Sequence, residues 1–237
     1  QTAKIGLIVL QTDQTIEDEF RQILAIDGVA LYHSRIANAM QVTPETLARM
    51  QADLPFTASL LPKSFEFDAI GYACTSGATI IGEEQVAQLI LAQHPHAKVS
   101  NPLTACKAAC AALKLNNIAL LTPYTPEVTQ VLSDSLCASG IEIAHTGYFD
   151  IEDDFEVGRV DSASLFNAII ALGSHEDCAG VFVSCTSLRV VNIILKAEKR
   201  LGKPVISSNQ ALAWHLLRLS GVDEELPHFG CLFSQGC

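Results

Sequence analysis

Two segments of the chain share one pattern, in which an apolar stretch ends in the tripeptide Cys-Thr-Ser. Residues 68–77 read DAIGYACTSG and residues 179–188 read AGVFVSCTSL, which places Cys74 and Cys185 111 residues apart. The flanking segments repeat in the same order, with 5–13 matching 118–124 and 100–113 matching 207–219. Each half therefore reads as one α/β unit of about 110 residues. Two such units can pack around a pseudo-twofold axis, with equivalent strand ends facing each other.

Apolar strand patterns alternate with helical periodicity along the whole chain, which is typical of β-α units on a mostly parallel sheet. The expected strands are 4–10, 68–73, 118–122, 141–148, 179–184 and 205–207. The expected helices are 15–24, 83–93, 103–113, 125–138, 162–172, 187–200 and 210–219, and another starts at Thr43-Pro44-Glu45. We predict two pseudo-symmetric α/β domains with parallel sheets, residues 1–112 and 113–237. The active site lies between them, and the last helix crosses over to the N-terminal domain.

The charge balance limits the partners that this chain can bind. It has 15 Lys and Arg against 26 Asp and Glu, a net charge of −11. Nucleic acids and anionic membranes are bound through clustered positive charge, so both are disfavoured. Its eight cysteines include no C-x-x-C pair, and about half of all residues are hydrophobic. A disulfide framework or a zinc site is therefore not expected, and we predict a reduced, cytoplasmic protein without a bound metal.

The Cys-Thr-Ser turns lie where ligands bind in open α/β sheets, beyond the carboxyl ends of the strands. Free backbone N–H groups at such turns hold a carboxylate, and Thr75, Ser76 and Thr186 add hydroxyl donors. We expect helix N-termini there to lower the pKa of each cysteine. A cysteine on each side of a small acid suits removal of a proton from one face of a carbon and delivery to the other. That chemistry needs neither metal nor cofactor.

At these residues the chain resembles the aspartate/glutamate racemase superfamily, over nearly its whole length. The matching segments are IGLIVLQTDQT, GYACTSG, TPYTPEV, VSCTSL and GKPVISSNQALAW. The resemblance is strongest to the branch of maleate isomerases, arylmalonate decarboxylases and ectoine-utilisation racemase-like proteins. It implies two similar α/β domains, no cofactor, a small carboxylate substrate and a homodimer. It also implies catalytic roles for Cys74 and Cys185, with Tyr124 orienting the substrate.

Two positions depart from the maleate isomerase pattern. The resemblance places Asp13 and Asp154 where those enzymes carry asparagines that bind a substrate carboxylate. A carboxylate beside a second carboxylate is unfavourable, so these aspartates favour an ammonium or amide N–H group instead. The sequence thus points to an amino-acid derivative, such as N-acetyl-2,4-diaminobutyrate derived from ectoine.

Three hypotheses follow. The first is a cofactor-independent racemase or epimerase that uses Cys74 and Cys185 as its acid and base. The second is a maleate cis-trans isomerase with a nucleophilic Cys74. An arylmalonate decarboxylase-like enzyme fits less well, because the resemblance places a glycine at position 74 in those enzymes. The third is a small-molecule-binding protein that keeps the fold without activity.

Overall fold

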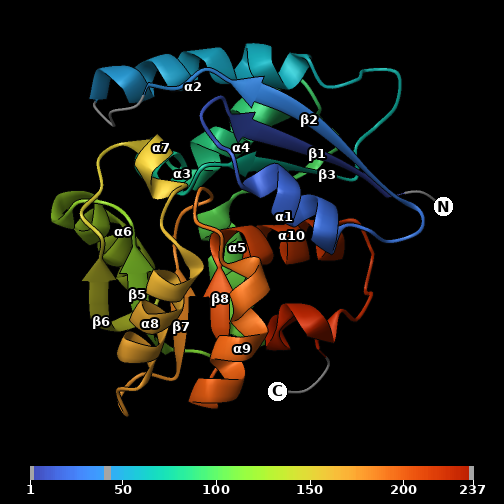
Figure 1. Ribbon diagram of the computed structural model, residues 1–237. Coiled ribbons are helices and arrows are strands. Elements are labelled where there is room, and N and C mark those ends of the chain that lie inside the picture. Colours follow the sequence, from blue (N-terminus) through green and yellow to red (C-terminus); the bar gives the residue numbers. More distant parts are fainter. Residues whose placement is uncertain (1–2, 40–43, 235–237) are drawn as a thin grey trace.

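The computed structural model describes residues 3–39 and 44–234, which form two four-stranded parallel sheets (Figure 1). The first has the order β2-β1-β3-β4, formed by β1 (Ala3–Leu10), β2 (Val29–Ile36), β3 (Ala69–Ala73) and β4 (Lys98–Ser100). The second has the order β6-β5-β7-β8, formed by β5 (Asn117–Thr122), β6 (Glu142–Tyr148), β7 (Gly180–Val183) and β8 (Val205–Ser207). The two orders are equivalent, so the sequence repeat corresponds to a repeat of topology.

The central strands of both sheets are buried on both faces, and successive side chains enter different cores. In β1, Ile5 and Leu7 point into a core shared by the two sheets, whereas Ile8 belongs to the outer core of the first sheet. In β5, Leu120 joins the shared core and Leu121 joins the outer core of the second sheet. Such strands need apolar residues at every position, which explains why they read as continuous hydrophobic runs.

Helices pack against both sheets. The helices of the first half are α1 (Ile16–Ile23), α2 (Pro44–Ser59), α3 (Thr75–Ile81), α4 (Glu83–Leu91) and α5 (Pro102–Ala112). Those of the second half are α6 (Pro126–Ala138), α7 (Asp154–Val157), α8 (Ser162–Gly173), α9 (Val191–Leu201) and α10 (Ser208–Leu219), followed by short 3-10 turns at Pro227–Phe229 and Cys231–Phe233. None of these helices, within residues 3–39 and 44–234, is long and apolar enough to cross a membrane.

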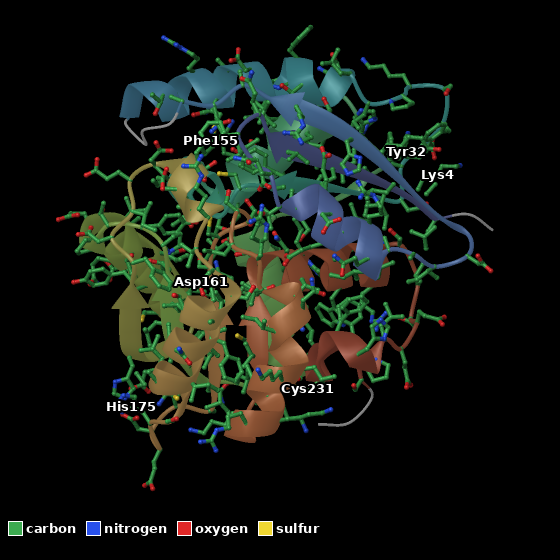
Figure 2. All side chains as sticks on the ribbon, viewed as in Figure 1. Lys4, Tyr32, Phe155, Asp161, His175 and Cys231 are labelled. Carbon is green, nitrogen blue, oxygen red and sulfur yellow. The ribbon has the colours of Figure 1, made fainter. Side chains whose placement is uncertain are left out.

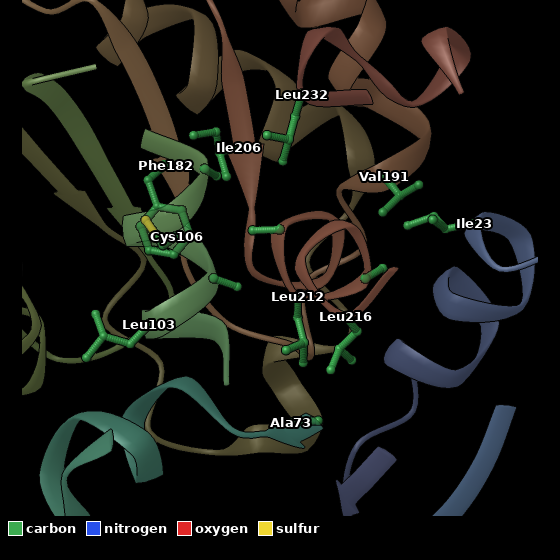
Figure 3. Close-up of a cluster of buried hydrophobic side chains, with 14 of the residues drawn as sticks. Ile23, Ala73, Leu103, Cys106, Phe182, Val191, Ile206, Leu212, Leu216 and Leu232 are labelled. Carbon is green, nitrogen blue, oxygen red and sulfur yellow. The ribbon is translucent and has the colours of Figure 1, made fainter. Parts of the chain in front are cut away.

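Helices α5 and α10 lie together between the sheets, and each contacts the sheet of the other half (Figure 1). Helix α10 packs on β3 and α1, and α5 contacts β8. Figure 3 shows Leu212 and Leu216 of α10 in this shared core, with Ala73 from the first sheet and Ile206 from the second. The last helix therefore contacts the first sheet. The division at residues 112 and 113 stays a prediction.

Most expected elements are present, with ends shifted by one or two residues. Helix α2 begins at Pro44, and its expected cap Thr43 lies outside the described residues. Strands β2 and β4 and helix α7 were not anticipated by the sequence patterns, whereas α3 is the helix whose start was expected after Cys74. The expected helix 187–200 starts later, at Val191, because residues after Cys185 form an irregular turn.

Candidate active site

The first Cys-Thr-Ser turn joins β3 to α3. Cys74 is the N-cap of α3, and its sulfur accepts the backbone N–H of Gly77 at 3.2 Å. The hydroxyl of Ser76 lies 3.7 Å from the same sulfur. Cys74 is 4% exposed, so the thiol sits in a nearly closed environment with its polar contacts directed at the sulfur. This is the arrangement expected of a helix-capping cysteine.

The second turn differs from the first. Cys185 follows β7 with a φ of 121°, a backbone conformation that non-glycine residues rarely adopt. Its sulfur accepts the N–H of Ser187 at 3.4 Å, but no helix begins here. The expectation that both turns pass directly into helices is therefore correct for Cys74 and wrong for Cys185. A strained residue held by its surroundings is a common feature of functional sites.

Tyr124 brings the two turns into one site. Its phenol hydrogen-bonds to Cys185, and burial, followed by the nearby sulfurs of Cys185 and Cys74, raises its pKa well above the usual value. The tyrosine follows β5, the strand next to β7 in the second sheet. Both sulfurs thus lie close enough to one phenol to influence its ionisation, as the proposed pseudo-twofold arrangement requires.

Ser208 contacts both Cys-Thr-Ser turns. Its hydroxyl oxygen accepts the backbone N–H of Cys185 at 3.0 Å and lies 3.0 Å from the hydroxyl of Thr75. Thr75 and Ser208 are both buried. The N–H of Cys185 therefore already donates to Ser208, and the hydroxyl of Thr75 already has one hydrogen-bond partner within the protein. The sequence expectation of two free donors at these positions needs this correction.

Asp154 connects the N-terminal loop with the second turn. One of its carboxylate oxygens accepts the hydroxyl of Ser187 at 3.0 Å, and the other accepts the hydroxyl of Thr12. Its negative charge disfavours the thiolate forms of both Cys74 and Cys185, after the larger effect of burial. The carboxylate is thus close to both sulfurs, at the position where the sequence predicted a nitrogen-binding group.

Asp13 lies deeper, at 3% exposure. Its Oδ1 accepts the N–H groups of Thr15 and Ile16 at 2.7 and 2.9 Å, which orders the turn before α1. Burial raises the pKa of this carboxyl to about 6; hydrogen bonds, including one to Thr186, oppose the rise, and the charge of Asp154 adds to it. Asp13 therefore builds the loop and also adds negative charge near the site.

The expected lowering of the thiol pKa is wrong. Burial raises the pKa of Cys74 to about 11, and the hydrogen bonds from Gly77 and Ser76 only partly offset it. Burial and then Asp154 raise the pKa of Cys185 further still. Desolvation penalises the charged thiolate more than a single turn of helix stabilises it. Both cysteines are therefore protonated thiols in the unliganded site near neutral pH.

A buried carboxyl behind the second turn escaped the sequence analysis. Glu19 on α1 accepts the N–H of Val191 at 2.9 Å and the side-chain amide of Asn209 at 2.7 Å. Asn209 also donates to the carbonyl of Thr186 at 2.8 Å. Ser208 and Asn209 were within reach of the sequence, because they repeat the pair Ser100-Asn101 that directly precedes α5. Glu19 had no such signal.

The whole arrangement defines a class. Two equivalent parallel sheets meet with a cysteine from each at a shared, buried site, which is the architecture of the aspartate/glutamate racemase superfamily. Within it, the family model described as "Arylmalonate decarboxylase" matches residues 68–233. The chain belongs to this family.

Individual relatives agree with this placement. A maleate isomerase of Geobacillus stearothermophilus is 27% identical, with 98% of this chain and 97% of that protein covered. The arylmalonate decarboxylase of Bordetella bronchiseptica is 31% identical over 126 residues, 52% of each chain. A variant of the Nocardia farcinica maleate cis-trans isomerase, solved with a covalently bound succinylcysteine intermediate, has the same fold at a TM-score of 0.89, 23% identity and full coverage of both chains.

These matches confirm the predicted branch of maleate isomerases and arylmalonate decarboxylases. The chain is an enzyme of this cofactor-independent type, with a catalytic cysteine. The hypothesis of a binding protein without activity is thereby set aside.

Proposed function

We propose that this enzyme is a racemase or epimerase of an amino-acid derivative that carries one carboxylate and one ammonium or amide N–H group. The observation behind this proposal is the placement of two buried thiols around Tyr124, with the carboxylate of Asp154 beside both. Two proton carriers on opposite sides of one carbon are what inversion of a C–H centre requires.

The reaction balances without any co-reactant. One cysteine enters the step as a thiolate and removes the α-proton, so that a C–H bond breaks and an S–H bond forms. The electron pair moves onto the substrate carboxylate as an enediolate. The other cysteine donates its proton to the opposite face, which forms the new C–H bond and leaves a thiolate there. Ser76, Thr75 and Tyr124 are the donors available to stabilise the enediolate charge.

The acidic groups favour a nitrogen-bearing substrate over a dicarboxylate. The charge of Asp154 raises the pKa of Asp13, and it has the same effect on both thiols. A cation at Asp154 would offset this charge, and so lower the pKa of both cysteines when the substrate binds. Substrate binding would then generate the thiolate that the free enzyme disfavours. A second carboxylate at the same place would have the opposite effect.

The test is proton NMR in D2O with one enantiomer of N-acetyl-2,4-diaminobutyrate. We expect loss of the α-proton signal together with formation of the other enantiomer. Cys74→Ser and Cys185→Ser should each abolish inversion. Each variant keeps one thiol, so it should still exchange the α-proton slowly and with retention of configuration, but only in the enantiomer whose α-proton faces that thiol. Cys137→Ser, which removes an exposed cysteine, is the matched control. Full racemase activity in Cys185→Ser would refute the two-thiol mechanism.

Maleate isomerisation is the second candidate, because the curated maleate isomerases match the chain over almost its full length. In that case Cys74 adds to the double bond, the C–C bond rotates, and elimination of the thiolate gives fumarate. Mass spectrometry of enzyme quenched during turnover of maleate would show a mass increase on the peptide containing Cys74. Because two negative charges disfavour a dicarboxylate, Asp13→Asn and Asp154→Asn should turn maleate over faster than the parent enzyme does. Slower turnover in these variants would contradict the electrostatic argument.

A further inference from the structure

A cluster of metal-binding side chains lies on the second sheet, outside the site described above. His145 is on β6, and His175 and Asp177 are on the loop between α8 and β7. One ligand atom from each of the three lies within 4.8 Å of the others. The Nε2 atom of His145 is 2.7 Å from a carboxylate oxygen of Asp177, and the two imidazole rings stack at 3.8 Å. Figure 2 shows His175 at the lower edge of the molecule, away from the first sheet.

The loop that carries two of these residues is fixed by its backbone. The ammonium of Lys203 donates to the carbonyl of His175 at 2.6 Å and to that of Gly173 at 2.9 Å. The side-chain amide of Asn117 donates to the carbonyl of Asp177 at 2.6 Å. His145 itself belongs to a paired strand. The backbone is therefore held in place, and only the exposed side chains of His175 and Asp177 need to move to meet an ion.

We propose that His145, His175 and Asp177 bind a divalent transition-metal ion of the zinc type. Two imidazoles and a carboxylate are suitable ligands for such ions, which bind them at about 2.0–2.2 Å. An ion between His145 and Asp177 takes the place of the hydrogen bond between these two side chains. Small rotations of the exposed His175 and Asp177 side chains complete a three-ligand site, with a water molecule in the remaining position.

The electrostatics support an ion at this place. The chain as a whole carries a net charge of −11, which favours retention of a cation. Elsewhere, His96 and Glu66 form an exposed pair 3.7 Å apart, one imidazole with one carboxylate. This pair provides a matched control, because it offers the same chemistry with fewer ligands.

The experiment titrates the full-length protein, stripped with a chelator, with Co2+ and then Zn2+. Cobalt absorption separates the proposed site from the cysteines, since thiolate ligands give an intense charge-transfer band and imidazole or carboxylate ligands do not. We expect one Co2+ per chain without that band, and displacement by Zn2+. His175→Ala and His145→Ala should each weaken binding about ten-fold or more. His96→Ala should bind as the parent protein does.

Three outcomes would overturn the proposal: no saturable binding, a thiolate band at the first equivalent, or unchanged affinity in His175→Ala. His175 lies on an exposed loop, so its replacement leaves the strands intact and the last result is free of folding effects. All readouts are of binding, so the proposed catalytic function stands or falls separately.

Discussion

Glu19 gives the strongest quantitative test of how the halves are joined. It is 3% exposed, and burial raises its pKa from 4.5 to about 7 despite hydrogen bonds from Asn209 and Val191. The native protein therefore keeps this proton up to about pH 7, whereas the unfolded chain releases it near pH 4.5. Between these values the native state binds more protons, so the free energy of unfolding falls as the pH rises.

The expected amplitude follows from the size of the pKa change. Each pKa unit corresponds to about 1.4 kcal/mol, so ionisation of Glu19 costs the native state about 3 kcal/mol once the pH is above 7. In Glu19→Gln this contribution disappears because an amide does not titrate. The side-chain amide nitrogen of the new glutamine faces an N–H donor. This lowers the free energy of unfolding by the same amount at every pH, so it does not change the dependence of stability on pH. Asp13 titrates in both proteins, and its charge makes only a minor contribution to the pKa of Glu19.

The assay is urea unfolding of both proteins at several pH values from about 5 to about 8. We expect the parent protein to lose about 2.5 kcal/mol more than Glu19→Gln across this range, because part of the full amplitude is already lost at pH 5. Asp18→Asn, which removes an exposed carboxylate from the same helix, reports the effect of one lost surface charge. Parallel curves for the parent protein and Glu19→Gln would show that Glu19 is already ionised when folded, and the burial argument would fail.

Three further predictions concern the site. Ser208→Ala leaves the buried N–H of Cys185 without its acceptor, so we expect about 1–3 kcal/mol lower stability by urea unfolding and a lower kcat. Gly77→Ala places a methyl group 2.6 Å from the Tyr72 hydroxyl and 2.9 Å from the sulfur of Cys74, which should displace both groups and reduce kcat; a normal kcat would show that the position of the thiol is not critical. Because the pKa of Cys74 is about 11, iodoacetamide labelling read by mass spectrometry should be slow at pH 7.5, should rise about ten-fold per pH unit up to about pH 10, and should follow labelling of the exposed Cys137.

The repeat of Cys-Thr-Ser made much of this fold predictable. The apolar run predicts a strand, the tripeptide that follows it marks the carboxyl end of that strand, and ligands in parallel α/β sheets bind at such ends. Strand β2 was missed because its sequence, VALYHSRI, is only partly buried and lacks a continuous apolar run. Strand β4 is only three residues long, which is too short to give a recognisable pattern.

The electrostatics of the site were beyond the reach of the sequence. A helix N-terminus beside Cys74 could be inferred locally, but the depth of its burial depends on elements far away in the chain. The same holds for Ser208, whose partners are Thr75 and Cys185 in two other turns. Contacts between distant segments decide the sign of a pKa shift, and a single sequence does not encode them in a readable pattern.

The exchange of α5 and α10 between the sheets gives the molecule the organisation of a domain-swapped dimer contained in one chain. The last helix of each half packs against the sheet of the other half. The segment between α5 and β5 links the two halves covalently and keeps them at a high effective concentration. Assembly of the paired-cysteine site thus becomes a unimolecular event, independent of how dilute the enzyme is.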